Sequence, residues 1–167
     1  MQSRRILIAL IVLVVGGVGW YLFRPERLWV NQKVNETLSP VAQPTSTQTT
    51  EPMPLLAGSF HSGAHKTVGT ATVYRLDNGS RVLRLTGFET SNGPDVHVYL
   101  VAANDATDDA TVTKSGFLEL GALKGNVGDQ NYDVPAGVDL DKYRAVTIWC
   151  RRFGVNFGTA PLAPQHS

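Results

Sequence analysis

An uncharged apolar run close to the N-terminus constrains this chain more than any other feature. Residues 6–23, ILIALIVLVVGGVGWYLF, carry no charged side chain. A helix of about 18 residues is roughly 27 Å long, which is close to the apolar thickness of a bilayer. Trp20 and Tyr21 lie near one end of the run, where aromatic side chains favour the membrane interface. The run therefore predicts a single transmembrane helix in contact with the lipid bilayer, after a short N-terminal tail of residues 1–5.

A cleavable signal peptide is the alternative interpretation of the same run. The small residues Gly16, Gly17 and Gly19 suit a cleavage site, but the bulky side chains directly after them favour an uncleaved anchor. No cysteine lies directly after the run to take a lipid, which argues against a lipoprotein.

A spacer poor in apolar side chains separates the predicted helix from the rest of the chain. Residues 39–54, SPVAQPTSTQTTEPMP, are rich in Pro, Thr, Ser and Gln and cannot bury enough apolar surface to fold. The basic residues on the two sides of the helix nearly balance, so the positive-inside rule does not orient it. Since such spacers commonly hold exported domains away from their membrane, we expect a single-pass protein of the cell membrane whose C-terminal domain is extracytoplasmic.

The segment between the predicted helix and this spacer has two interpretations. Val30, Val34 and Leu38 follow one another at intervals of four residues, which is typical of a short amphipathic helical turn at the membrane surface. The alternative is a poorly ordered juxtamembrane stalk that continues into the linker, over residues 24–54 as a whole.

The charge and the cysteine content exclude several classes of protein. A formal net charge of +1 without a basic stripe argues against nucleic acid as a partner. Cys150 is the only cysteine, so the chain cannot form an internal disulfide, nor supply a cysteine-rich zinc site or an iron–sulfur cluster by itself. Its stability must therefore come from an apolar core.

Residues 55–163 have the pattern of an all-β domain, followed by a tail, residues 164–167, that we expect to be disordered. Short runs of β-branched side chains alternate with glycine, and no stretch keeps the period of a long helix. Asn78-Gly79 separates two such runs and is typical of a tight hairpin turn. The polar stretch over residues 104–116 is expected to be a loop. The pattern predicts an all-β domain, joined by a flexible linker to the transmembrane helix.

The last strong strand, YRAVTIWC, ends at Cys150 and raises the question of what this thiol does. Val146, Ile148 and Cys150 fall on one face of the strand, which places the sulfur in the interior. Free cysteine is often buried and behaves there as a small apolar side chain. If the sulfur instead reached solvent, Arg151 and Arg152 would favour the thiolate and make it more reactive.

Several segments, taken in order, resemble the DM13 domain family. They are GSFHSGAHKTVGTATVYRLDNGSRVLRLTGFETSNGPDVHVYL, then LGALKGNVGDQNYDVP, then YRAVTIWCRRFGVNFGTAPL, and together they lie within residues 55–163. The resemblance implies a compact β-rich, sandwich-like domain of a kind that occurs beside DOMON and cytochrome-type domains and is suspected of electron transfer. This sequence contains neither companion domain, so we expect the electron donor to be a separate redox or envelope protein.

The resemblance also implies two functional residues, the family's cysteine at Cys150 and its early histidine at His65. Many members have an acidic residue directly after the cysteine, where this chain has Arg151. An adjacent carboxylate and an adjacent guanidinium shift a thiol pKa in opposite directions. A mechanism that needs that acid therefore does not carry over to this chain.

Histidines before the first predicted hairpin supply candidate metal ligands. His61 and His65 are four residues apart in the loop HSGAH, and with Cys150 they would form a site of two imidazoles and one thiolate. Such a site would take copper or iron, and haem is a further candidate, but the sequence does not identify the cofactor. The prediction requires three residues that are distant in sequence to converge in the fold.

These residues lead to two functional hypotheses. The first is a membrane-tethered, extracytoplasmic accessory module of redox chemistry or electron transfer, in which Cys150 and His65 bind a metal or relay an electron. The alternative is a non-catalytic binding or scaffold module of the cell envelope with a structural, buried Cys150. A hydrolase would need a serine in a nucleophile context beside Asp95 and His97, which the sequence does not provide. We therefore expect an electron-transfer or binding module rather than a substrate-specific enzyme.

Overall fold

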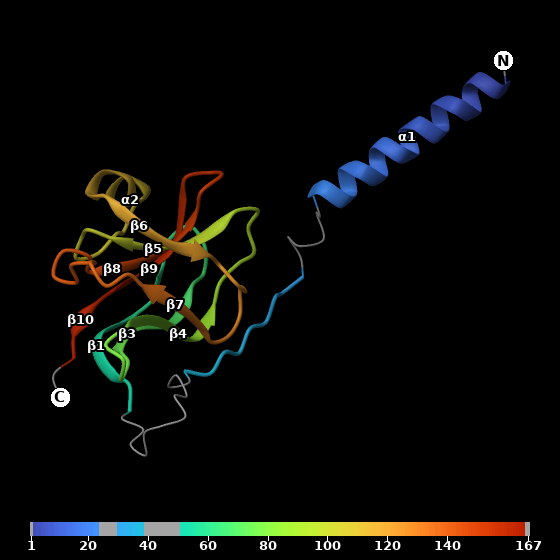
Figure 1. Cartoon of the computed structure of the whole chain (residues 1–167). Helices are drawn as coiled ribbons and strands as arrows, with labels where there is room; N and C mark the ends of the chain where they lie inside the picture. The colour runs from blue at the N-terminus through green and yellow to red at the C-terminus, as the bar shows by residue number, and fades with distance from the viewer. Residues whose placement is uncertain (1, 24–29, 39–50, 166–167) are drawn as a thin grey trace. The chain divides into compact units, whose positions relative to one another are not determined.

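The computed structural model describes residues 2–23, 30–38 and 51–165. The chain forms two compact units, Met1–Val30 and Asn31–Ser167. Helix α1 (Gln2–Phe23) belongs to the first unit, and the strands and the short helix α2 (Asp109–Ser115) belong to the second (Figure 1).

Helix α1 is long and apolar enough to cross a membrane. Its apolar stretch, Arg4–Tyr21, is not buried against any other part of the chain, as expected of side chains that would face lipid. The helix predicted over residues 6–23 is confirmed, and it begins earlier, at Gln2. Signal sequences share this length and composition, so α1 by itself does not distinguish a membrane anchor from a signal peptide, and it does not show which side of the membrane the domain occupies.

The second unit is a sandwich of two antiparallel five-stranded sheets, which confirms the predicted fold class (Figure 1). The first sheet has the strand order β10-β1-β3-β4-β7, and the second has the order β2-β9-β8-β5-β6. The strands of the first sheet are β10 (Ala163–Pro164), β1 (Met53–Ser59), β3 (Val68–Arg75), β4 (Arg81–Glu89) and β7 (Gln130–Val134). The strands of the second sheet are β2 (His61–Ser62), β9 (Val155–Pro161), β8 (Ala145–Cys150), β5 (Val96–Val101) and β6 (Phe117–Ala122).

The predicted hairpin turn joins β3 to β4. The backbone N–H of Leu76 donates to the carbonyl of Ser80 over 2.9 Å, and the Ser80 N–H donates to Asn78 Oδ1 over 2.9 Å. Gly79 has a φ of 79°, a conformation that glycine adopts without a steric penalty. Local turn chemistry therefore sets the register of the first sheet at its centre.

The main apolar core lies between the two sheets. Alternate residues of the facing strands fill it, because successive side chains of a strand point to opposite faces. Its fully or almost fully buried members include Val73, Leu83, Leu85, Phe88, Val98, Leu100, Val146, Ile148, Cys150 and Phe157. This core supplies the stability that a chain without disulfides requires.

A second apolar cluster covers the opposite face of the second sheet. Helix α2 places Val112 against a group formed by Tyr99, Val101, Ala106, Ala145 and Trp149. The stretch of residues 104–116 is therefore not only a loop, because Asp108 caps α2 by accepting a hydrogen bond from the Thr111 N–H over 2.7 Å. With both faces of the sheet covered, every residue of β8 is buried.

Residues 31–38, here called the docked segment, lie on the sandwich in an extended conformation. The Val34 N–H donates to the Val127 carbonyl, and the Glu36 N–H donates to the Asp129 carbonyl, each over 2.9 Å. The helical turn expected from the spacing of Val30, Val34 and Leu38 is not formed. The reason is that these backbone groups bond to residues 127–129 instead of to one another.

Two glycines allow the docked segment to approach the domain backbone. A Cβ atom on Gly125 would collide with the Gln32 carbonyl, and a Cβ atom on Gly128 would collide with the Val34 carbonyl. Gly128 also has a φ of 102°, which other L-residues rarely adopt. The compact unit thus includes residues that precede the predicted domain start at residue 55.

We expect Gly128→Ala to destabilise the domain by roughly 1–3 kcal/mol, because the new methyl group combines backbone strain with a collision. Urea unfolding followed by tryptophan fluorescence measures the change. Gly137→Ala is the matched control, since a Cβ at Gly137 would have no atom within 4 Å and the residue is exposed. Equal stability of the two variants would contradict the close docking of residues 31–38.

Candidate functional site

Cys150, the predicted redox residue, is sealed in the core between the sheets. It ends β8, where it pairs with Val96 of β5 and Val155 of β9, and its exposed fraction is 0%. It shares its face of the strand with Val146 and Ile148, as the alternation of the sequence predicted. A thiol in this position packs as a small apolar side chain and is out of reach of a reagent or of a protein partner.

The two predicted histidines are engaged elsewhere. The His65 ring lies against the ring of Phe157, with 3.9 Å between the ring centroids, and its backbone N–H donates to the Phe157 carbonyl. His61 belongs to β2, and its Nε2 lies 2.8 Å from Asp105 Oδ1. Phe157 is part of the same apolar core as Cys150, and the His65 ring packs against this phenylalanine.

A metal centre is not formed by these residues. Among the residues that the structure describes, no three His, Cys, Asp or Glu side chains converge into a group that could hold a metal ion. Cys150, His65 and His61 do not form such a group in the part of the chain that the structure describes, and a cofactor such as copper, iron or haem stays a prediction. The redox role of the thiol itself stays a prediction.

A cluster of charged residues lies at the end of the second sheet where β5, β6 and β8 meet. His97 is almost completely buried, with 8% of its side chain exposed, and its Nε2 lies 2.8 Å from Asp95 Oδ1. Its Nδ1 lies 2.7 Å from Glu119 Oε1, but the orientation does not satisfy hydrogen-bond geometry, so this contact is electrostatic. Both ring nitrogens face carboxylates, which leaves neither nitrogen to activate a serine for hydrolysis.

Arg151 completes this cluster and does not assist the thiol. Its Nε lies 3.1 Å from Asp95 Oδ2, and its Nη1 lies 3.7 Å from Glu119 Oε2. The hydrogen bond from His97, and then the guanidinium of Arg151, hold the pKa of Asp95 below its usual value against the opposing effect of burial. The hydrogen bond to Asp95 likewise raises the pKa of Arg151. The guanidinium is thus paired with two carboxylates. This pairing explains how the fold tolerates a basic residue directly after the buried Cys150.

Aromatic side chains continue from this cluster along the covered face of the second sheet. The Tyr99 ring stacks on Phe117 with 4.4 Å between centroids, and Trp149 lies 6.4 Å from Tyr99. Burial, and then the charge of Glu119, raise the pKa of Tyr99. Trp149 and Tyr99 therefore pack across the sheet, and their buried rings do not form an exposed binding patch.

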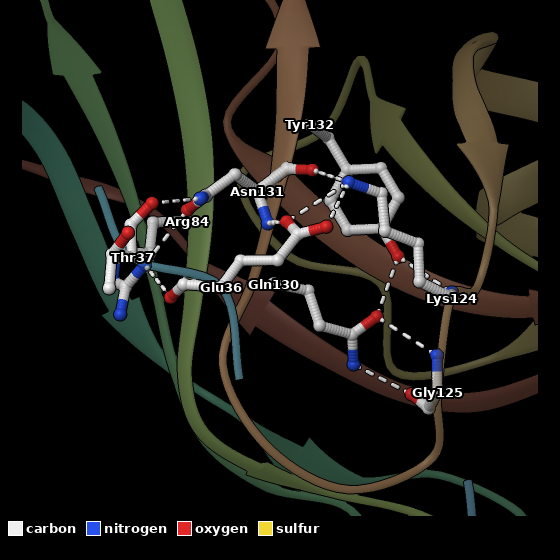
Figure 2. A network of polar contacts seen from close by, with 8 residues as sticks. All are labelled: Glu36, Thr37, Arg84, Lys124, Gly125, Gln130, Asn131 and Tyr132. Carbon is white, nitrogen blue, oxygen red and sulfur yellow. Dashed lines mark hydrogen bonds and ion pairs between the residues drawn. The ribbon is translucent and has the colours of Figure 1, made fainter. Parts of the chain in front are cut away.

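The docked segment forms a second polar network, at the opposite sheet (Figure 2). The Glu36 carboxylate accepts hydrogen bonds from Lys124 Nζ at 2.8 and 3.0 Å and from the Asn131 N–H at 2.7 Å. Arg84 Nη1 donates to the Glu36 carbonyl over 2.9 Å, and Asn131 Nδ2 donates to the Thr37 carbonyl over 3.0 Å. Burial alone would raise the pKa of Glu36, but the hydrogen bond from Lys124, together with the other donors and cations, lowers it.

The network continues into the core through Gln130, whose exposed fraction is 0%. Gln130 Nε2 donates to the Gly125 carbonyl over 2.6 Å, and Gln130 Oε1 accepts from the Gly125 N–H and from the Tyr132 hydroxyl (Figure 2). Burial raises the pKa of Tyr132 to about 12, and the charge of Glu36 adds to the effect. The loop that receives the docked segment is thus held by a buried amide, which keeps its backbone groups aligned with residues 31–38.

A family model described as Electron transfer DM13 matches residues 59–162, more than half of the chain. The chain belongs to the DM13 family. The match begins at the last residue of β1 and ends between β9 and β10, so it covers the strands from β2 to β9 but not β10, most of β1, α1 or the docked segment. No curated protein and no solved structure matches the chain.

Sequence reasoning did not find the docked segment of this DM13 protein. The Glu36–Lys124 pair joins residues 88 positions apart, and no local pattern indicates such a contact. One signal was present, because the stretch NQKVNET before the spacer lacks the Pro- and Ser-rich composition of the spacer itself. The glycines in LKGNVGD were a second signal, since close backbone approach is one reason for glycine at such positions.

We expect Glu36→Gln to lower the stability of the DM13 domain at pH 7 by about 1 kcal/mol or less, the usual range for a partly exposed ion pair. The pKa of Glu36 is lowered in the folded state, so its contribution is present above the unfolded value near 4.5 and is lost as the pH falls through the folded value. The difference between wild type and variant in urea unfolding should therefore shrink below about pH 4.5. Glu51→Gln, at an exposed glutamate outside the network, is the control, and a difference independent of pH would contradict the assignment.

Proposed function

We propose that this chain is a membrane-anchored, extracytoplasmic accessory module of an electron-transfer system, in which the DM13 domain contributes a binding surface rather than thiol chemistry. Membership of a family described as electron transfer supports the type of system. The apolar helix α1 supports the membrane anchor, and the composition of the spacer supports a position outside the cytoplasm. In this proposal a separate redox or envelope protein provides the electron carrier.

The observation that carries the proposal is the complete burial of Cys150 among aliphatic side chains. Thiol–disulfide exchange requires a thiolate that another sulfur can reach, and a sealed thiol offers no such access. The nearest arginine in sequence, Arg151, is bound to Asp95 and Glu119, so it does not stabilise a thiolate. Cys150 is then a packing residue, and contact with the partner falls to the surface of the sandwich.

The alternative function is the redox module in which Cys150 acts with His65. The family description as electron transfer supports it, and the resemblance implies that Cys150 is the family's cysteine. Oxidation of a thiol by one electron also releases its proton, so this mechanism needs a base within hydrogen-bond reach of the sulfur. The His65 ring lies against Phe157 in the described structure, and it would have to leave that position to serve as the base.

Thiol reactivity of the full chain in detergent micelles separates the two functions. We expect the native Cys150 thiol to resist a water-soluble thiol reagent until the domain unfolds, and the purified chain to be colourless and free of stoichiometric metal. Ser80→Cys supplies a positive control, because residue 80 is exposed on the hairpin turn. Rapid modification of the native thiol, or a visible absorption band that Cys150→Ser abolishes, would favour the redox module instead.

We also expect Cys150→Ala to destabilise the domain by roughly 1–3 kcal/mol, because it leaves a small cavity in a close-packed core. Cys150→Ser should cost at least as much, since a buried hydroxyl needs a hydrogen-bond partner that this apolar cluster does not offer. Chemical denaturation of both variants measures the loss. Unchanged stability in both would argue that the thiol is kept for chemistry rather than for packing.

The membrane anchor has its own test in cells. We expect the chain to remain in the membrane fraction with α1 retained, and the DM13 domain to be digested by protease added from outside. Mass spectrometry of the mature protein identifies whether residues 2–23 are present. A processed chain in the soluble fraction would identify α1 as a signal peptide and overturn the anchor.

A further inference from the structure

The docked segment begins directly after the end of the first compact unit. Asn126, which is almost fully buried, receives it at two points: its Oδ1 accepts from the Gln32 N–H over 2.7 Å, and its Nδ2 donates to Asn31 Oδ1 over 2.9 Å. Asn126 Nδ2 also donates to the Thr90 carbonyl over 3.1 Å, which fixes the amide in place. The segment is therefore held from its first residue onward.

The far end of the docked segment is held as well. Glu36 binds Lys124 and the Asn131 N–H, and the Thr37 carbonyl accepts from Asn131 Nδ2. The next element of the domain in sequence is β1, which starts at Met53 and lies in the first sheet. Residues 39–52 thus connect two places on the same compact unit rather than linking the helix to the domain.

We propose that residues 31–38 act as a clasp. When the clasp is bound to the domain, the Pro/Thr/Ser-rich spacer is not part of the tether, which is the stretch of chain between α1 and the domain. This inference rests on the proposed membrane anchor. With the clasp closed, only residues 24–30 connect α1 to the domain, and about seven residues can reach no further than roughly 25 Å. With the clasp open, residues 24–52 form the tether, and about 29 residues extend to roughly 100 Å at most. The clasp therefore sets how far from the bilayer the domain can meet a partner.

The contacts of the clasp suit a reversible device. Besides the hydrogen bonds from Asn126, Asn131 and Arg84, it is held by the Glu36–Lys124 ion pair, in which the lysine side chain is 42% exposed and the glutamate side chain 33% exposed. An ion pair with this much solvent exposure contributes little binding free energy, and salt or competing charges weaken it further. The receiving loop, by contrast, is fixed by Gln130 and stays formed when the segment leaves.

Insertions at two positions test the clasp in the full chain reconstituted into vesicles. A donor dye is placed on Ser80→Cys, and acceptor dyes are placed on the lipid headgroups; the buried Cys150 thiol does not take the dye. Ten Gly/Ser residues are inserted either between residues 26 and 27 or between residues 45 and 46. We expect the first insertion to lower energy transfer and the second to leave it unchanged, because only the first lies in the tether.

Lys124→Glu shifts the clasp toward its open state, since it replaces an attraction at Glu36 with a repulsion between two negative charges. In this background the insertion after residue 45 should lower energy transfer as well, whereas Lys142→Glu, the same charge change outside the network, should not alter the wild-type pattern. Equal effects of the two insertions in the wild-type background, or no effect of either, would overturn the clasp.

Vesicle flotation separates failure of the clasp from failure of the membrane anchor. A chain that floats but shows equal effects of the two insertions refutes the clasp alone. A chain that does not float refutes the anchor and the clasp together.

Discussion

Burial of the second sheet on both of its faces is the constraint on which the rest of the structure depends. The first sheet covers one face, and α2 with its preceding loop covers the other, so β8 has no position that faces solvent. Because side chains alternate along a strand, Trp149 and Cys150 enter different apolar clusters although they are neighbours in sequence. A shift of the strand by one residue would exchange the indole and the thiol, which would overpack one cluster and leave a cavity in the other.

The same double burial explains the polar pairs on the covered face. A polar side chain there is stabilised by a partner, because leaving a buried polar atom unpaired costs free energy, and among the described residues His97 Nδ1 and Asn156 Oδ1 are the buried side-chain atoms without a hydrogen bond. The hydroxyls of Thr147 and Thr159 lie 2.9 Å apart, and Asn156 Nδ2 donates to the Ala106 carbonyl. At the edge of this face, His97 is enclosed by carboxylates whose charges Arg151 balances. The charged cluster thus satisfies polar side chains at one face of the second sheet. The sheet separates it from the Cys150 thiol, which lies on the other face.

The first sheet is built differently, because only one of its faces belongs to the core. Ala71 and Val73 of β3 are buried, whereas the residues between and beside them are partly or fully exposed. Docking of residues 31–38 near β4 and β7 adds a layer that the family model does not include. In the proposed function, a docked segment that sets the reach of the domain from the membrane would link the architecture of this sheet to the meeting with a partner.

Much of the fold could be predicted from the sequence, because it follows from local patterns. Alternation along residues 145–150 predicted an inward Cys150, Asn78-Gly79 predicted the central hairpin, and the apolar run predicted α1. Ordered motifs led to the DM13 family, which the family model confirms.

The meeting of distant side chains was decided only by the tertiary structure. Histidines and the thiol did not converge as expected, and Glu36 met Lys124 without any local signal. The physical reason is that such contacts depend on strand register, which a bulge such as the one after Ile148 shifts by a residue, and on backbone approaches that glycines permit. A local pattern determines which face a side chain occupies, but the assembled sheets determine what it faces.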